Sequence, residues 1–191
     1  AKPGSRERML DAARAEIVSH GIARTSVAAI AERAGVSRPT LYRQCGDKDQ
    51  IVAAVAQREV VDFFTRASFI IAGLRSSQEK LIEAFGMGMR EAREHPVVRA
   101  LRDFETDSFT RRLVEMDTPP YRSVISVAAA LLSDGNHSTS VMETTLDLSL
   151  RITATFLISP SPYSPAGDDD SARAFAHRYL LPILQAAREA S

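Results

Sequence analysis

The stretch from Ser26 to Lys48 constrains the fold most, because it contains two short helical patterns separated by a tight turn. In the first pattern apolar side chains recur at intervals of three and four residues and form one face of a helix. These residues are Val27, Ile30, Ala31 and Ala34. The second pattern is shorter and mostly polar, so it needs a neighbouring helix to hold it in place.

The turn between the two patterns has residues suited to ending one helix and starting another. Gly35 follows the first helix at the position that often takes a left-handed conformation, which costs Gly least. Val36 is placed to fill the gap between the helices. Ser37 is a capping residue for the second helix, and Pro39 falls in its first turn, where a missing N–H costs little. The stretch therefore predicts a helix-turn-helix.

The second helix is predicted to expose Arg38, Thr40, Tyr42 and Arg43. A helix whose first residues enter the major groove of DNA needs hydrogen-bond donors for phosphates and base edges at such positions. Guanidinium groups bind guanine in a bidentate manner, which makes Arg38 and Arg43 the candidates for base contacts. We therefore interpret the motif as a DNA-binding element, although an exposed charged face is also typical of ordinary solvated helices.

Residues on both sides of the motif resemble the TetR family of bacterial transcriptional regulators. The resemblance lies in Leu10–Arg14 with Ile17 and His20-Gly21, in Thr25-Ser26, in Leu41–Arg43, and in Gly46–Asp49. It covers roughly the first quarter to third of the chain. Three places differ from the usual family residues, because Gln44-Cys45 replaces His or Tyr followed by Phe, Ile17 replaces Phe, and Glu16 replaces Leu.

The resemblance implies roles for individual residues. Tyr42 and Lys48 resemble the phosphate contacts of the family, as does Thr25 or Ser26 at a helix N-terminus, where free N–H groups favour an anion. Cys45 is expected to be a buried structural thiol. The full set of predicted DNA-binding residues is Thr25, Ser26, Ser37, Arg38, Thr40, Tyr42, Arg43 and Lys48.

Composition is compatible with this interpretation and excludes several others. The 191 residues have a formal net charge of zero, but residues 1–60 carry ten Lys and Arg against seven Asp and Glu, and residues 61–191 carry fourteen against seventeen. One Cys excludes an internal disulfide, and no apolar run is long enough for a membrane helix, so we expect a cytoplasmic protein. No metal-ligand spacing, catalytic motif or phosphate-binding loop is present, so we expect neither a cofactor nor an enzyme.

Beyond the motif, apolar residues recur at helical spacing almost everywhere, so the whole chain is predicted to be all-α. We expect helices over residues 48–74, 77–94, 97–104, 107–116, 119–132, 138–158 and 171–190, with a kink at Pro182. Residues 1–50 are predicted to form a three-helix DNA-binding domain. Residues 51–191 are predicted to form a helical domain for effector binding and dimerisation.

Two surfaces of the second domain are predicted. The helices over 138–158 and 171–190 carry more apolar residues than one flank of a bundle requires, among them Leu150 and Leu184, and the resemblance implies that they form a four-helix dimer interface. The central helices offer residues that line either a ligand pocket or an ordinary core. They are Phe85, Met87, Met89, Phe104, Phe109, Leu113, Met116 and Tyr121. Gly86 and Gly88 inside a helix fit either alternative.

The sequence thus predicts a TetR-like regulator, in most family members a repressor, that binds a pseudo-palindromic operator in double-stranded DNA as a homodimer. Its predicted effector is a small hydrophobic or aromatic molecule. The alternative is a DNA-binding protein of the same fold without such an effector, controlled by a protein partner.

Overall fold

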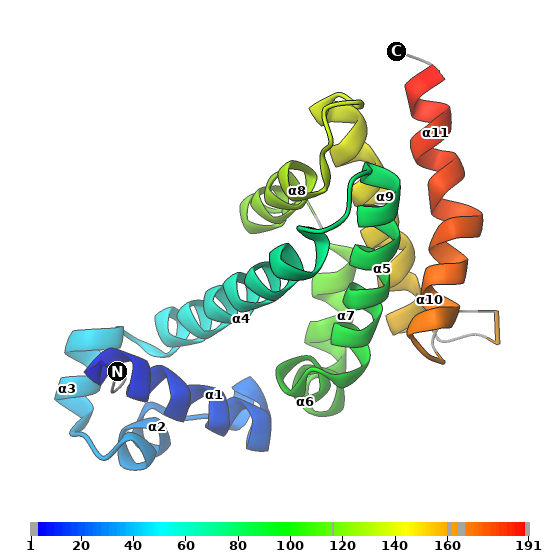
Figure 1. The fold of residues 1–191 in the computed structure, drawn as a ribbon. Coiled ribbons are helices and arrows are strands. Elements are labelled where there is room, and N and C mark those ends of the chain that lie inside the picture. Colours follow the sequence, from blue (N-terminus) through cyan, green and yellow to red (C-terminus); the bar gives the residue numbers. More distant parts are fainter. Residues whose placement is uncertain (1–3, 116, 160–161, 164–166, 190–191) are drawn as a thin grey trace. The chain divides into compact units, whose positions relative to one another are not determined.

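The computed structural model describes residues 4–115, 117–159, 162–163 and 167–189, and all regular elements in these ranges are helices (Figure 1). In chain order they are α1 (Ser5–Arg24), α2 (Val27–Ala34), α3 (Arg38–Cys45), α4 (Lys48–Ile71), α5 (Ser77–Glu94), α6 (Pro96–Phe104), α7 (Thr106–Val114), α8 (Pro119–Leu132), α9 (Thr139–Ile158), α10 (Asp169–Phe175), the π-helical turn η1 (Ala176–Leu180) and α11 (Leu181–Glu189). The all-α prediction is confirmed for these ranges. No helix in the described part is both long and apolar enough to cross a bilayer.

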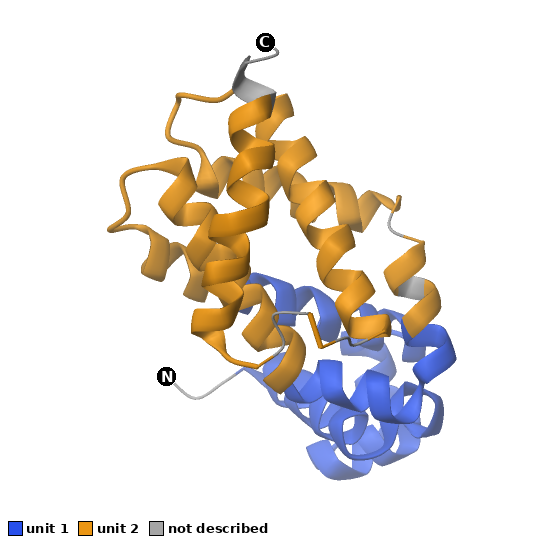
Figure 2. Cartoon of the chain, turned by 90° about the vertical axis from the view of Figure 1, so that its right-hand side faces the viewer, with its two compact units in different colours: residues 1–63, 95–109 blue, residues 64–94, 110–191 orange. Residues whose placement is uncertain are grey.

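The chain forms two compact units (Figure 2). Unit 1 contains residues 1–63 and 95–109, and unit 2 contains residues 64–94 and 110–191. Unit 1 therefore includes α6, which is distant in sequence from α1–α3, together with most of α4. The sequence offered no local signal for this grouping, because the contacts that define it join residues about eighty positions apart.

Unit 1 has its own hydrophobic core. It is built from apolar faces of α1, α2, α3 and α4, and its most completely buried large side chains include Met9, Ile17, Ile30, Leu41 and Ile51. Val97 of α6 packs against the same core. The apolar face of α2 was visible in the sequence as a spacing of three and four residues. Packing on this shared core holds the short helices α2 and α3 in position.

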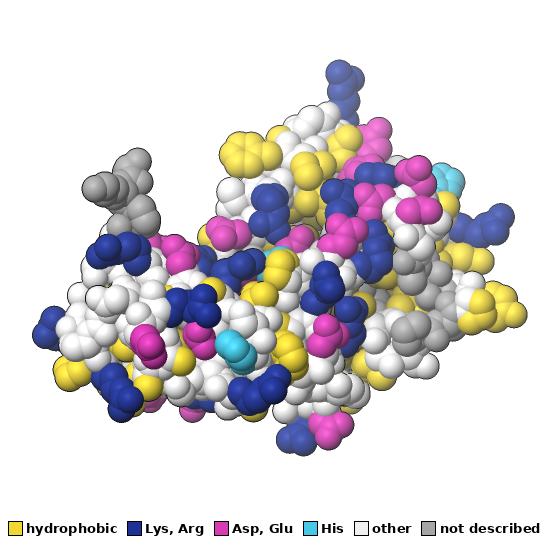
Figure 3. All heavy atoms as spheres, turned by 90° about the horizontal axis from the view of Figure 1, so that it is seen from below, with side chains coloured by type: hydrophobic (Ala, Val, Ile, Leu, Met, Phe, Trp, Pro, Cys, Tyr) yellow, Lys and Arg dark blue, Asp and Glu magenta, His cyan; other side chains and the backbone are white. Residues whose placement is uncertain are grey.

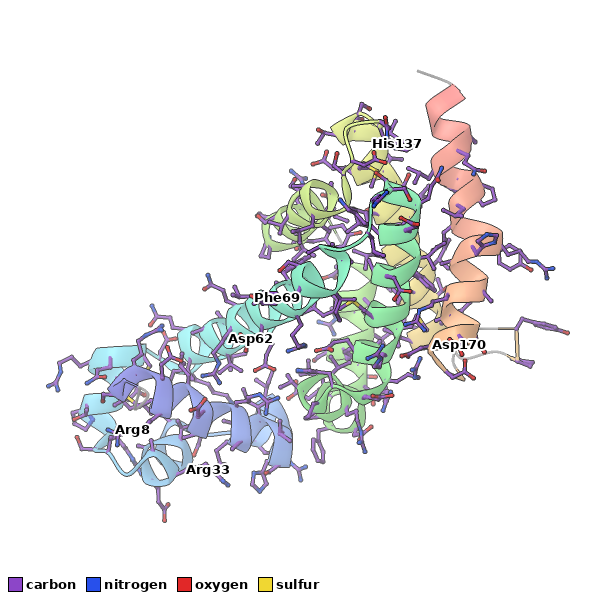
Figure 4. The ribbon with its side chains drawn as sticks, viewed as in Figure 1. Arg8, Arg33, Asp62, Phe69, His137 and Asp170 are labelled. Atoms are coloured by element: carbon purple, nitrogen blue, oxygen red, sulfur yellow. The ribbon has the colours of Figure 1, made fainter. Side chains whose placement is uncertain are left out.

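Ion pairs also link the helices of unit 1. Glu16 of α1 is a buried carboxylate that accepts a hydrogen bond from Arg33 Nε of α2 at 2.6 Å. Arg33 extends from α2 beside α1 (Figure 4). Glu59 of α4 is paired with Arg14 of α1 at 2.8 Å and with His95, which precedes α6, at 2.8 Å. Glu59 thus connects three segments of unit 1 through one side chain.

Unit 2 is a second helical core, formed by α5, α8, α9, α10, η1 and α11. Phe85 and Met89 of α5, Met142 of α9, and Leu180 and Leu184 near the C-terminus are all buried in it. The ring of Phe85 is stacked on that of Phe175, with centroids 5.7 Å apart. Outside the apolar core, Arg173 of α10 forms a bidentate salt bridge with Glu83 of α5.

The C-terminal helix is interrupted where the sequence predicted a kink. Pro182 has no N–H and cannot donate to the carbonyl four residues earlier. The helix responds with the π-helical turn Ala176–Leu180, in which Leu181 N–H donates to Ala176 O, five residues back. Such a turn keeps the helix continuous even though the hydrogen bond that Pro182 cannot donate is absent.

Candidate nucleic-acid interface

The helix-turn-helix forms as its sequence predicts. Ser26 caps α2 by accepting a hydrogen bond from Ala29 N–H at 3.1 Å, and Gly35 ends the helix in a left-handed conformation with φ of 66°. Ser37 then caps α3 by accepting from Thr40 N–H, with Pro39 in the first turn. Val36 is half-buried against the core of unit 1, as expected for a residue between two helices.

The core of unit 1 sets the orientation of α3. Leu41 and Cys45 face inward and are buried, so the opposite side of this eight-residue helix faces solvent. Arg38, at the first position of α3, and Tyr42 and Arg43 are exposed, and Tyr42 is 51% accessible despite its large aromatic ring. Three of the predicted DNA-binding residues are therefore exposed on the same short helix.

The α3 N-terminus holds two more predicted residues. The hydroxyls of Ser37 and Thr40 lie 2.9 Å apart and are hydrogen-bonded to each other. Ser37 Oγ also serves as the cap, so its acceptor capacity is used within the helix. We therefore regard these two hydroxyls first as the device that starts α3, and only second as donors for a phosphate.

One predicted residue lies in the interior. Thr25 is 2% exposed, and its hydroxyl donates to Gly21 O at 2.7 Å, so in this conformation it has no surface from which to contact a phosphate. Ser26, the other residue that the sequence offered for this phosphate contact, is exposed. We correct the predicted set accordingly, because a β-branched residue next to the helix end packs inward and satisfies its hydroxyl locally.

Lys48, at the start of α4, has an intramolecular partner. Its ammonium donates to Ala23 O at 3.1 Å, near the C-terminus of α1. An ammonium group has three donors, so this bond leaves two for a phosphate. Asp47 precedes it as the cap of α4, with Gln50 N–H donating to Asp47 Oδ1 at 2.9 Å and Asp47 N–H donating to Gln50 Oε1 at 3.0 Å.

Sequence reasoning missed Arg6. Burial raises the pKa of the Cys45 thiol at the end of α3, and the nearby charge of Arg6 on α1 partly opposes that rise. Arg6 is exposed, so it extends the basic side chains of α3 onto α1. The motif could not reveal it because Arg6 lies about thirty residues upstream of the turn. Cys45 itself is buried, as predicted, with its sulfur 3.8 Å from that of Met9.

Charge alone does not mark the interface. The view in Figure 3 shows Lys and Arg side chains interspersed with Asp and Glu over the visible surface, without one continuous basic patch. What distinguishes the α3 face is the coincidence of an exposed helix, a fixed orientation and donors of suitable type.

The predicted ligand-binding residues do not gather in one place. Phe85, Met87 and Met89 are buried in unit 2, whereas Phe104 and Phe109 belong to unit 1. Leu113 is half-buried, and Met116 lies outside the described residues. Of the two glycines of α5, a side chain at Gly86 would meet Arg173 at 3.4 Å, whereas Gly88 has open space.

Tyr121 is the predicted ligand-binding residue that lies at a groove, one of about 440 Å³ between α8 and α9. Its hydroxyl donates to Asp147 Oδ1 at 2.8 Å. Burial together with this bond raises the pKa of Tyr121, so the phenol stays protonated. The hydrogen bond from Arg151 lowers the pKa of Asp147. Ile125 supplies an apolar contact in a groove otherwise lined mainly by polar residues.

Comparison with known proteins identifies the N-terminal segment. Residues 9–55 match the model of the bacterial regulatory proteins of the tetR family. An uncharacterized HTH-type transcriptional regulator of Mycobacterium tuberculosis is 44% identical over 55 residues, which is 29% of each chain. Its counterpart in Mycobacterium bovis is 48% identical over 48 residues, 25% of each chain. The alignment thus spans less than a third of these curated relatives.

Solved structures resemble the whole fold. The TetR family repressor AlkX from Dietzia sp. superposes with a TM-score of 0.65 at 21% identity, covering 97% of this chain and 100% of that one. The fatty acid degradation regulator FadR from Bacillus halodurans gives a TM-score of 0.60 at 15% identity, covering 98% and 96%. The N-terminal match, the helix-turn-helix geometry and the shared all-α fold lead to one assignment: residues 9–55 are a DNA-binding segment of the tetR-family type, in a chain whose fold resembles that of TetR family regulators.

Proposed function

We propose that this protein is a transcriptional repressor that binds a pseudo-palindromic operator in double-stranded DNA as a homodimer, and that a small hydrophobic or aromatic effector releases it. The observation that carries the proposal is the exposure of Arg38, Tyr42 and Arg43 on α3, a helix that Leu41 and Cys45 anchor in the core. TetR family proteins are DNA-binding regulators, not enzymes, and we place this one in the cytoplasm with its DNA target.

Dimerisation is supported by the outward side of α9. Its exposed residues recur at intervals of four, three, four and three, which is the spacing of a helix seam that packs on another helix. They are Thr144, Leu148, Arg151, Thr155 and Ile158. Tyr179 of η1 is also exposed, at 53%. By contrast, Leu184 is buried and Leu150 is half-buried inside unit 2, so neither position belongs to the seam.

The effector is supported by the size of unit 2, which contains more helices than a dimer interface requires. The groove at Tyr121 has a mostly polar lining, which suits the polar end of such a molecule. A volume of about 440 Å³ is within the range of small-molecule sites. AlkX is described as implicated in biodegradation of n-alkanes, and FadR as a regulator of fatty acid degradation. From these two neighbours we carry over to this chain only the proposal that its effector is apolar.

The burial of Phe85, Met87 and Met89 in the core favours the alternative, a regulator of the same fold without a small-molecule effector and under control of a protein partner. The two proposals differ in one measurable property. An effector binds the purified protein and weakens its hold on DNA, whereas the alternative predicts that no small molecule does both.

The test of DNA binding is a selection from random duplex DNA with the full chain at low salt. We expect an enriched motif with two inverted half-sites, and affinity that falls steeply with salt because each neutralised phosphate releases counterions. An Arg38→Ala/Arg43→Ala variant serves as the matched control and should lose the motif while keeping its helical circular dichroism. Selection without any enriched sequence contradicts the proposal.

The effector is tested next, on the same protein with the selected DNA. Alkanes, fatty acids and aromatic acids are screened by thermal shift, and each compound that raises the melting temperature is added to the DNA complex. Release of DNA at the concentration that stabilises the protein supports the effector proposal. Stabilisation without release, or no stabilising compound, favours the effector-free alternative.

A further inference from the structure

The C-terminus of α1 bends sharply at Gly21, and the bend is covered by α6. Gly21 has φ of 78°, in the left-handed region that favours glycine. A Cβ atom built on it would lie 2.7 Å from Cβ of Phe104, closer than real side chains approach. Phe104 therefore occupies the space that a side chain at position 21 would need, and both residues belong to unit 1.

Two further contacts join the end of α6 to the same bend. Glu105 Oε1 accepts a hydrogen bond from Ala23 N–H at 2.7 Å. The guanidinium of Arg24 lies over the Phe104 ring, 4.9 Å from its centroid, within the range of cation–π attraction. Three kinds of contact therefore join residues 21–24 to residues 104–105: steric packing of Phe104 on Gly21, a hydrogen bond and a cation–π interaction.

Lys48 contacts the other side of the same residue. Ala23 N–H donates to Glu105, and Ala23 O accepts from Lys48 Nζ at 3.1 Å. Glu105 and Lys48 therefore bind the two backbone polar groups of Ala23, its N–H and its carbonyl. Thr25 reinforces the bend, since its hydroxyl and its N–H both donate to Gly21 O. The position of the Ala23 carbonyl that binds Lys48 therefore depends on the conformation of the bend at Gly21.

We propose that Glu105 and Phe104 are positioning residues for DNA binding, which hold Ala23 so that its carbonyl directs the Lys48 ammonium toward the phosphate backbone. The inference rests on the proposed DNA-binding function. Neither residue touches DNA in this account. They act through Ala23, and α6 is part of the DNA-binding unit for this reason, although the sequence assigned it to the effector domain.

The physical argument is one of side-chain entropy. A lysine side chain has a large rotamer entropy, of up to ~2 kcal/mol when free, and much of it is lost when the ammonium contacts a phosphate. A fixed carbonyl that already holds one of the three donors removes part of that loss before DNA arrives. When Glu105 no longer anchors Ala23, the carbonyl moves with the bend and this advantage disappears.

The charge of Glu105 acts in the opposite direction. A carboxylate near the DNA-binding surface repels phosphate, so its removal alone would strengthen binding. Glu105→Gln separates the two effects, because the amide oxygen still accepts from Ala23 N–H while the charge is gone. Glu105→Ala removes both. If positioning matters, the Gln variant binds at least as well as the unmodified protein, whereas the Ala variant binds less well.

The experiment measures binding of the full-length chain to its selected duplex by fluorescence anisotropy across a salt series. Glu105→Ala and Phe104→Ala are expected to reduce the slope of log K against log salt by up to about 0.9 per subunit, the value for one phosphate contact. With that loss, the deficit in affinity of the variant relative to the unmodified protein is about eightfold larger per subunit at 0.1 M than at 1 M salt. Asp103→Ala is the matched control, since Asp103 pairs with its neighbour Arg102 on α6.

A double-mutant cycle decides whether the effect passes through Lys48. In a Lys48→Met background, Glu105→Ala should leave the salt slope unchanged, because the contact it positions no longer exists. An unchanged slope in the Glu105→Ala single variant, or equal effects with and without Lys48, overturns the inference. Melting temperatures of all variants identify any that unfold, and Glu105→Gln, which retains the acceptor, keeps the test valid in that case.

Failure of this inference is distinguishable from failure of the proposed function. If the unmodified protein selects no DNA sequence, DNA binding itself is wrong. If it binds a defined sequence with a steep salt dependence but Glu105 and Phe104 do not alter the slope, the function holds and Lys48 is positioned without α6.

Discussion

Glu16 shows how a residue that departs from its family's usual pattern finds a partner elsewhere. The sequence places Glu at a position where the resemblance leads one to expect Leu, and the structure buries it to 7% exposure. The carboxylate is acceptable there because Arg33 of α2 bonds to it at 2.6 Å and His20, one turn later in α1, lies 3.4 Å away. Nothing local in the sequence connects Arg33 with Glu16, because the two residues lie on different helices.

Removing only Arg33 from the Glu16–Arg33 pair should lower the free energy of unfolding more than removing both side chains. Arg33→Met leaves the Glu16 carboxylate buried without its strongest bond, and we expect the free energy of unfolding to fall by about 1–2 kcal/mol, discounted because Arg33 is partly exposed. The double variant Glu16→Leu/Arg33→Met should recover most of that loss. Urea denaturation at pH 7 measures both. Arg8→Met, at an exposed position on α1 (Figure 4), is the control, and a double variant less stable than the single one contradicts the account.

Exposed residues of α3 should divide into two classes by their effect on DNA binding. Arg38→Ala or Arg43→Ala should cost about 1–3 kcal/mol of binding free energy for the best operator and relax the preference at particular base pairs. Tyr42→Phe removes only a hydroxyl and should weaken binding to all sequences alike. Binding to a panel of single-base operator variants measures the difference. A uniform loss in both arginine variants would mean that they contact phosphates, not bases.

At the scale of helices, most boundaries were predictable because caps and breakers are local. Ser26, Ser37, Asp47 and Ser138 stand one residue before α2, α3, α4 and α9, and each accepts a bond from a backbone N–H of its own helix. The predicted span 77–94 matches α5 at both ends. Grouping of the helices was not predictable, because the contact of α6 with α1 depends on residues 83 positions apart, Gly21 and Phe104.

Asp134 caps α5 from outside that helix and should give it acid-sensitive stability. Burial would raise the pKa of Asp134, but hydrogen bonds from the N–H groups of Ser77 and Asn136 lower it overall, well below its ordinary value. A lowered pKa means that the contribution is complete above the unfolded pKa of about 3.9 and is lost as the pH falls below it. Asp134→Ala should therefore cost about 1 kcal/mol at pH 7.

The same variant should differ less from the unmodified protein in acid. Urea midpoints measured from pH 7 down to pH 2 should converge for the two proteins below about pH 4, since the Asp134 carboxyl then binds a proton in the unfolded chain while it stays ionised in the folded protein. Asp62→Ala, at an exposed position on α4 (Figure 4), is the control and should show no such convergence. A constant difference at all pH values would show that Asp134 acts through packing, not through its charge.

At the scale of the molecule, the helix-turn-helix that carries the proposed DNA contacts was largely predictable, and the grouping of the predicted ligand-binding residues was not. The motif is encoded within some twenty consecutive residues, so its pattern alone predicts that Arg38, Tyr42 and Arg43 are exposed on one short helix. A pocket needs side chains from several helices, and apolar residues that line one look the same in sequence as residues that fill a core. Phe85 and Met89 proved to be core residues, and Phe104 covers Gly21 instead of facing a ligand.

The dimer that would place two α3 helices about 34 Å apart on one side of DNA should depend on the exposed seam of α9. Leu148 is 40% exposed in the protomer, so Leu148→Arg leaves the core of unit 2 intact while placing a charge in the seam. We expect light scattering at micromolar concentration to show a protomer for this variant and a dimer for the unmodified chain. Leu184→Arg is unsuitable for this purpose, because Leu184 is buried and its loss would unfold the unit.

Binding to full and half operators links this change in assembly to function. Val127→Arg, on α8 and 47% exposed, is the matched control, since it adds the same charge to an exposed aliphatic residue outside the seam. The seam variant should lose affinity for the full operator but retain the weaker affinity for a half-site, because each α3 still contacts its own bases while the second contact is no longer intramolecular. Equal affinity of both variants for the full operator, with Leu148→Arg monomeric, would show that the two DNA-binding units act independently and that the seam serves another purpose.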